Sequence, residues 1–369
     1  MHGILPCDQY NFDKTGFSIG VGGQQYVVTM DLAKKCAESP SDSNRDHVSL
    51  VETVSADGSV LPPLCIMKGA VVLFQHVSNY LNLDPNMLLA TSESGYSNDQ
   101  IALSFIRHFD KFSALRQKGA WRLLIFDGHG SHLTYKFITY CWDNKIIPFG
   151  LPSHTSHILQ PLDVVIFQPL KHYHKQQVEV ATRLGCDDFN KVEFLNAIQL
   201  IRRKTFTETT IKASFREAGL YPLNPDLVLS KLKTVDRPST PSTIESMFAQ
   251  SPPTPFTPKS IDFFARNFIQ GINLENGEMK VRLDRVTKLA RCGIANAAAR
   301  LAAEHELKVV NAATNARKRR QKSDRRQIGN IGPVYISDAR LTVAKRNEKE
   351  DQKRQKAAKR AAEVVAKSQ

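Results

Sequence analysis

The fold is decided by the stretch Arg122-Leu-Leu-Ile-Phe-Asp127-Gly-His-Gly-Ser-His132, in which an apolar run leads straight into an aspartate and a glycine turn. A continuous apolar run of this length predicts a strand that is buried on both faces. Glycine adopts backbone angles that other residues resist, so Gly128 and Gly130 are expected to end the strand. The pattern places Asp127 at the carboxyl end of a central strand, where open α/β sheets gather their active groups. An Asp-Gly turn without chemistry is the alternative that this stretch alone leaves open.

The segments before this strand predict further strands. The runs 48–54 and 61–68 are rich in apolar residues and flank Asp57-Gly58. Asp-Gly between two such runs is a strong signal for a hairpin. Residues 24–31 are rich in β-branched and aromatic residues and predict one more strand.

The chain opens with a short motif, Tyr10-Asn-Phe-Asp13-Lys-Thr-Gly16. Successive side chains of a strand point to opposite faces, so Tyr10 and Phe12 are expected on one face and Asn11 and Asp13 on the other. Gly16 then permits a turn. Alone, this motif is equally typical of an ordinary Asp-x-x-Gly turn.

Helical patterns alternate with these strands. Apolar residues recur at three- and four-residue spacing after Ser97 or Asn98, either of which can cap a helix. Further helices are expected over 134–144, 192–203 and 207–218, and a short strand over 146–152.

Leu159-Gln-Pro161-Leu-Asp163 is expected to open another helix. Proline suits the first turn, since its missing N–H would be unpaired there, and the helix dipole favours a carboxylate at Asp163. Asp163 can therefore be only a dipole-complementing residue. Pro169 is expected to break or kink this helix.

Four histidines lie near these aspartates: His129, His132, His154 and His157. They permit two interpretations, a metal-binding cluster or polar loop residues beside a phosphate site. The second is favoured because histidine is common in such loops.

The charge is unevenly distributed along the 369 residues, whose net charge is +14. Residues 317–369 hold 17 basic and 6 acidic residues, whereas residues 1–316 hold 33 and 30. A basic tail suits a polyanion such as DNA, although a solvated tail is the simpler alternative. The candidate nucleic-acid contacts, which also resemble a nuclear import signal, are Arg317, Lys318, Arg319, Arg320, Lys322, Arg325 and Arg326.

The remaining composition indicates a soluble intracellular protein. The six cysteines are scattered and none has Cys-x-x-Cys spacing, which is typical of free thiols in a reducing compartment. No signal peptide and no apolar run long enough to span a membrane is present. Residues 236–260 are rich in proline, serine and threonine and predict a disordered linker. We therefore expect a folded domain over 1–235 and a helical, basic tail over 261–369.

Three aspartates stand out as a possible site: Asp13, Asp127 and Asp163. Carboxylates are hard oxygen ligands that suit Mg²⁺ or Mn²⁺. Such ions can activate a water or a 3′-hydroxyl and stabilise the leaving oxygen of a phosphodiester. The pattern therefore indicates nuclease or strand-transfer chemistry.

Over about residues 8–225 the chain resembles the DDE superfamily endonuclease domain of pogo-like transposases of the mariner superfamily, especially fungal ones. The motifs that carry the resemblance are Tyr10-Asn-Phe-Asp13, the hairpin around Asp57, Gly95-Tyr-Ser-Asn98, His108-Phe-Asp110, Leu123 to His132, and Leu151 to Asp163.

The resemblance implies an RNase H-like mixed sheet flanked by helices, DNA as partner, a nuclear location and a metal-dependent transposase activity. It also implies that Asp13, Asp127 and Asp163 are the three metal-binding acids. A homodimer is left open.

Two departures from the family pattern bear on activity. Lys14 stands where the family usually has glutamate, and its positive charge can weaken cation binding unless it lies on the opposite face of the strand. Family members usually carry a helix-turn-helix region before the catalytic domain, and this sequence begins almost at the first catalytic strand. We therefore weigh an active or truncated transposase against a domesticated, non-enzymatic DNA-binding protein that keeps the fold.

Overall fold

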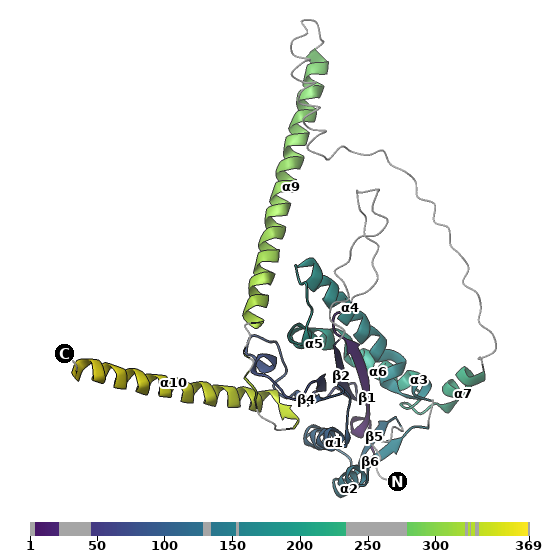
Figure 1. Ribbon diagram of the computed structural model, residues 1–369. Helices are drawn as coiled ribbons and strands as arrows, with labels where there is room; N and C mark the ends of the chain where they lie inside the picture. The colour runs from purple at the N-terminus through teal and green to yellow at the C-terminus, as the bar shows by residue number, and fades with distance from the viewer. Residues whose placement is uncertain are drawn as a thin grey trace. The chain divides into compact units, whose positions relative to one another are not determined.

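The computed structural model describes residues 4–21, 46–127, 134–152, 155–233, 279–321, 324, 326–328 and 332–367. Its strands are β1 (Gln9–Ser18), β2 (His47–Ser55), β3 (Leu64–Lys68), β4 (Leu88–Ser92), β5 (Arg122–Phe126), β6 (Ile146–Gly150) and β7 (Val334–Tyr335). Its α-helices are α1 (Asp99–Ala114), α2 (Tyr135–Asp143), α3 (Ser156–Leu159), α4 (Phe167–Arg183), α5 (Lys191–Thr205), α6 (Glu208–Glu217), α7 (Pro225–Lys233), α9 (Met279–Arg320) and α10 (Ile336–Lys367). Short helical turns are η1 (Pro6–Asp8), η2 (Phe74–Val77) and η4 (Leu162–Ile166) (Figure 1).

The strands form one mixed sheet in the order β6-β5-β1-β2-β3-β4-β7. The first three strands pair antiparallel in succession, and β5 and β6 are added parallel to β1 on its other side. With helices on both faces, this arrangement confirms the predicted RNase H-like mixed sheet. The predicted hairpin is also present, with Gly58 at a positive φ of 96° in its turn.

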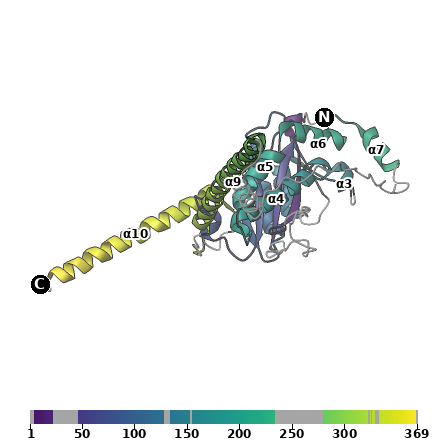
Figure 2. The same cartoon turned by 90° about the horizontal axis from the view of Figure 1, so that it is seen from above.

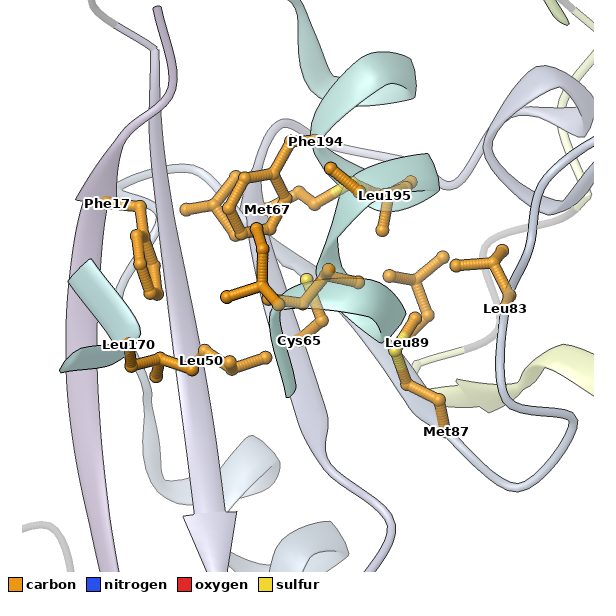
Figure 3. Packing of buried hydrophobic residues seen from close by; sticks show 14 of the residues in the cluster. Phe17, Leu50, Cys65, Met67, Leu83, Met87, Leu89, Leu170, Phe194 and Leu195 are labelled. Carbon is orange, nitrogen blue, oxygen red and sulfur yellow. The ribbon is translucent and has the colours of Figure 1, made fainter. Parts of the chain in front are cut away.

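The side chains of the sheet alternate between two apolar layers. Tyr10 and Phe12 of β1 pack with α1 and α2, whereas Phe17 faces the layer formed with α4 and α5. Figure 3 shows part of this second layer, in which Phe17 and Leu50 lie near Leu170 of α4, and Figure 2 shows α4 and α5 alongside the strands from another direction. Because Asn11 and Asp13 share the side of Phe17, they face the helical layer from which Asp163 comes.

The predicted helices are confirmed with shifts of a few residues at their ends. Asn98 is the cap of α1, since its side-chain oxygen accepts a 2.9 Å hydrogen bond from the Ile101 amide. The 68–98 segment, which has no clear periodicity, contains β4 and η2. The strand expected over 24–31 and the linker over 236–260 lie outside the described residues.

The C-terminal residues 314–369 form part of the folded domain. Residues 314–369 belong to the same compact unit as residues 1–235, while residues 236–313 form a second unit. The short strand β7 pairs antiparallel with β4 at the sheet edge, and Ile328 and Ile336 are buried in the core. Part of the region that the sequence predicts to be a separate tail, residues 314–369, therefore belongs to the folded domain. The predicted domain boundaries at residues 235 and 260 stay a prediction.

Arg340 fastens this C-terminal region to the loop after η2. Its guanidinium donates hydrogen bonds of 3.0, 3.1 and 3.0 Å to the carbonyl oxygens of Val77, Ser78 and Leu81. A planar guanidinium with several donors is suited to such a set of carbonyls. The carbonyls of Ser78 and Leu81 also accept backbone amides, from Leu81 and Leu83, so Arg340 adds a second hydrogen bond to each.

We expect Arg340→Ala to lower the free energy of unfolding by about 1.5–3 kcal/mol, because it removes charge-assisted hydrogen bonds from partly buried carbonyls. Urea denaturation of the full chain measures this change. Arg300→Ala is the matched control, since Arg300 is exposed and pairs only with Glu304 on its own helix. Equal effects of the two substitutions would contradict a fastening role for Arg340.

Candidate functional site

Asp13 lies near the middle of β1 and is only 7% exposed. Its carboxylate accepts a 2.7 Å hydrogen bond from the backbone amide of Lys14. The alternation along β1 directs the side chain toward the α4 layer, as the sequence predicts. A carboxylate held so deep in the sheet is costly unless a partner compensates for its charge.

Asp127 directly follows β5, the parallel neighbour of β1. Asn11 of β1 lies opposite Ile125 of β5, and this register, continued by two residues, sets Asp13 level with Asp127. The start of β5 is anchored by buried Arg122, which donates a 2.7 Å hydrogen bond to Asp110 of α1. The strand therefore presents Asp127 at its carboxyl end from a rigid support.

Asp163 enters from the other direction, in the π-helical turn η4 that leads into α4. The prediction that Pro169 breaks or kinks this helix is wrong for α4, which continues through Pro169 to Arg183. Pro169 is the third residue of α4, where its missing N–H is tolerated, and the irregular turn lies just before it. Single π-type turns are frequent at functional sites.

Asp13 and Asp163 share a hydrogen bond between their side chains. Burial and the charge of Asp163 raise the pKa of Asp13 well above its usual value, with a further contribution from Asp127. Burial also raises the pKa of Asp163, and the charge of Asp127 acts in the same direction. The shared bond raises the pKa of Asp13 and lowers that of Asp163. The structure thus brings the three aspartates within electrostatic reach of one another.

Lys14 is an electrostatic neighbour of this group. Burial lowers the pKa of the Lys14 ammonium, and the charges of Asp127 and Asp13 act against that shift. Although Lys14 follows Asp13 directly on β1, its ammonium group still lies within electrostatic reach of Asp13 and Asp127. Of the two alternatives for Lys14, the structure favours a positive charge close to the site.

Two basic side chains that sequence reasoning did not assign to the site act on Asp163. The charges of Lys171 and His157 both lower the pKa of this carboxyl group. Lys171 follows Asp163 by two helical turns, a spacing that could have indicated one helix face. His157 lies on α3, while His129, His132 and His154 fall outside the described residues, so the proposed histidine cluster is not tested.

The carboxylates suit a divalent cation by the chemistry of their oxygens. Hard oxygen ligands of this kind prefer Mg²⁺ or Mn²⁺. Within the described ranges, no three His, Cys, Asp or Glu side chains already stand close enough to form a complete ligand group. Asp13, Asp127 and Asp163 are the residues that would hold such a cation, and Asp13 would do so in its ionised form.

The basic cluster at 317–326 is partly used within the protein. Three of its arginines bind protein groups: Arg317 donates to the Gly185 carbonyl, Arg320 pairs with Glu193, and Arg326 pairs with Asp324 and Glu350. Lys318 and Arg319 are exposed, and Lys322 and Arg325 lie outside the described residues. The cluster thus supplies two described cations that face solvent.

Comparison with known families identifies a domain in this region. Residues 44–215 match the family model described as DDE superfamily endonuclease. The matched range contains Asp127 and Asp163 and begins after Asp13. The assignment of Asp13 to the same group therefore depends on the strand pairing and the shared hydrogen bond.

Two curated proteins are similar to the chain. The MFS-type transporter clz9 of Cochliobolus lunatus is 35% identical over 233 residues, which cover 63% of this chain and 25% of that protein. The pogo transposable element with ZNF domain of Homo sapiens is 30% identical over 167 residues, which cover 44% and 11%. The chain thus spans a quarter or less of either relative. Among the helices that the structure describes, none is long and apolar enough to cross a membrane.

Solved structures of the Mos1 transposase are similar in architecture. The Mos1 strand transfer complex has a TM-score of 0.41 and 11% identity, covering 63% of this chain and 56% of that one. The Mos1 mariner paired-end complex with Mn has a TM-score of 0.40 and 11% identity, covering 63% and 58%. These TM-scores are below 0.5, so the description of the fold rests on the strand order of the mixed sheet and not on this similarity.

Because the pKa of Asp13 is raised, the free energy of unfolding is expected to depend on pH through this residue. The folded chain holds this proton more tightly than the unfolded chain, so the associated stability is complete below the unfolded pKa of about 3.9 and is lost as pH rises through the folded pKa. We expect Asp13→Asn to be more stable than wild type at pH 7 in chelator, with a difference that shrinks toward pH 4. Urea denaturation at several pH values measures it.

Asp57→Asn is the control of opposite sign. Although burial raises the pKa of Asp57, hydrogen bonds from Ser59 and the charge of Arg116 lower it overall. The stability from Asp57 is therefore present above the unfolded pKa, and its loss should destabilise the chain at pH 7. An Asp13→Asn variant that is less stable than wild type at pH 7 would contradict the prediction that the ionised Asp13 carboxylate destabilises the fold.

Proposed function

The chain carries a DDE superfamily endonuclease domain, and we propose that it acts on DNA as a transposase-like, metal-dependent nuclease. The observation that supports this most directly is the convergence of Asp13, Asp127 and Asp163 from two parallel strands and one helix start. None of these residues is adjacent in sequence to another. Acidic groups with raised pKa values, such as Asp13 and Asp163, are typical of functional sites.

The three aspartates would hold divalent cations, Mg²⁺ or Mn²⁺. Bound ions of this kind activate water or a 3′-hydroxyl and stabilise the leaving oxygen of a phosphodiester. Asp13 would hold such an ion in its ionised form, and Asp163 would be held by the turn η4. Lys171 and His157 lie near Asp163 and would attract the phosphate backbone of DNA.

Lys14 favours a second function, that of a non-enzymatic DNA-binding protein that keeps the transposase fold. Its ammonium group lies near Asp127 and Asp13 and would compensate for their charges without a metal. The two functions differ in whether the carboxylates bind a divalent cation. A homodimer and a nuclear location, to which the basic cluster would direct the chain, are proposed with either function.

The decisive test is Mn²⁺ binding by calorimetry. The full chain is needed, because residues 314–369 belong to the same unit as the aspartates. We expect binding that is lost in Asp13→Asn and in Asp163→Asn, and we expect Asp127→Asn to abolish Mg²⁺-dependent nicking of plasmid DNA while the unfolding transition persists. Nicking that survives in Asp127→Asn would show that Asp127 is not a ligand. A wild-type chain that binds DNA but no Mn²⁺, with or without DNA present, would favour the non-enzymatic function.

For the basic cluster, we expect the double substitution Lys318→Ala and Arg319→Ala to weaken DNA binding. Each phosphate contact that is lost reduces the slope of log K against log salt by about 0.9, so the slope should fall by at most about 1.8. DNA titrations at several salt concentrations measure this slope. Both side chains are exposed, so the unfolding midpoint should not change. An unchanged slope would remove these two residues from the DNA contact.

A further inference from the structure

Asn11 is a fully buried polar residue in the middle of the sheet that the proposed chemistry does not use. It lies on β1 between β2 and β5, opposite Val54 on one side and Ile125 on the other. Its side-chain amide is satisfied in two directions. The Nδ2 group donates a 3.1 Å hydrogen bond to the Ile125 carbonyl, and Oδ1 accepts a 3.2 Å hydrogen bond from the Leu162 amide.

These two partners belong to the segments that carry the other two aspartates. Ile125 precedes Asp127 by two residues, and Leu162 immediately precedes Asp163. Asn11 itself precedes Asp13 by two residues on the same face of β1. One side chain therefore joins the backbones of all three aspartate-bearing segments, each within two residues of its carboxylate.

A second contact runs parallel to this one. Gln160, which is also fully buried, donates a longer 3.4 Å hydrogen bond from Nε2 to the Phe12 carbonyl. Its Oε1 atom has no hydrogen-bond partner among the described residues. The Asn11 amide, by contrast, uses both a donor and an acceptor, so it is the stronger constraint between β1 and the start of η4.

Only an amide fits this position well. The site needs a donor toward a carbonyl and an acceptor toward an N–H, and the two groups of asparagine meet both needs on a short side chain. An apolar replacement would leave the Leu162 amide unpaired in the core, and such a group costs more than an ordinary hydrogen bond contributes. The backbone of η4 would then lose its direct tie to the sheet.

We propose that Asn11 is a positioning residue of the DDE site, which sets the separation of Asp13, Asp127 and Asp163 by fixing their backbones. This inference rests on the proposed function, since it assigns Asn11 a role in the same metal-binding group. Asn11 does not touch the metal or the DNA. It acts as the outer partners of metal ligands do, whose loss typically weakens metal binding about 10–100-fold.

The test compares Asn11→Leu with Ser55→Ala in the full chain. Ser55 is a matched control, because it lies on β2 opposite Tyr10, beside Asn11 in the register. Its hydroxyl donates a partly buried 3.1 Å hydrogen bond to the Pro6 carbonyl, which precedes β1 and lies on none of the three aspartate-bearing segments. Urea denaturation measures stability, and calorimetry with Mn²⁺ measures the affinity of the site. Asn11→Ser, which keeps a short polar group, replaces Asn11→Leu if the latter does not fold.

Both substitutions should lower the unfolding midpoint, but only the Asn11 variant should weaken Mn²⁺ binding, by about tenfold or more. An Asn11 variant that folds and binds Mn²⁺ like wild type would overturn the inference and leave the proposed function intact. So would an equal loss of affinity in Ser55→Ala, because a general loosening of the sheet would then explain it. A wild-type chain without Mn²⁺ affinity would overturn the proposed function and this inference with it.

Discussion

The parallel pairing of β1 with β5 is the constraint on which the site depends. It sets two aspartates from distant parts of the sequence at one level of the sheet, because Asn11 lies opposite Ile125 and each aspartate follows two residues later. The pairing requires a crossover, which α1 provides on the face that Tyr10 and Phe12 bury. The opposite face of the sheet packs against α4, and Asp163 lies in the turn η4 that leads into this helix.

The site is a place where the fold gives up stability. Asp13 is buried beside the carboxyl group of Asp163, and burial together with the charges of Asp163 and Asp127 raises the pKa of Asp13. Such an arrangement is unfavourable in the free protein and becomes favourable with a cation, which is the usual trade between stability and function. Lys14 complicates this trade, since an ammonium group near the same carboxylates reduces the advantage that a metal would bring. Its charge is therefore central to the choice between an active nuclease and a DNA-binding scaffold.

Basic residues near the C-terminus have two roles that composition alone does not separate. Arg340 and Arg317 donate to backbone carbonyls, and Arg320 pairs with buried Glu193. These side chains hold the C-terminal region on the domain, in which β7 pairs with β4 at the sheet edge, where an unpaired strand would invite association. Lys318 and Arg319 remain available to a polyanion. The number of basic residues in this part of the sequence is therefore larger than the number of described basic side chains that could contact DNA.

The sequence by itself put forward Asp13, Asp127 and Asp163 as candidate metal ligands, with the help of the family resemblance. It also determined the central strand, the hairpin at Asp57-Gly58 and most helices. These features follow from local signals, namely apolar runs, turn residues and capping side chains, which act over a few residues. Only the tertiary structure decided that Asn11 bonds to Ile125 and Leu162, that Lys14 lies near Asp127, and that β7 completes the sheet at β4. Such contacts join residues more than a hundred positions apart, and their energy depends on burial and geometry that no local pattern encodes.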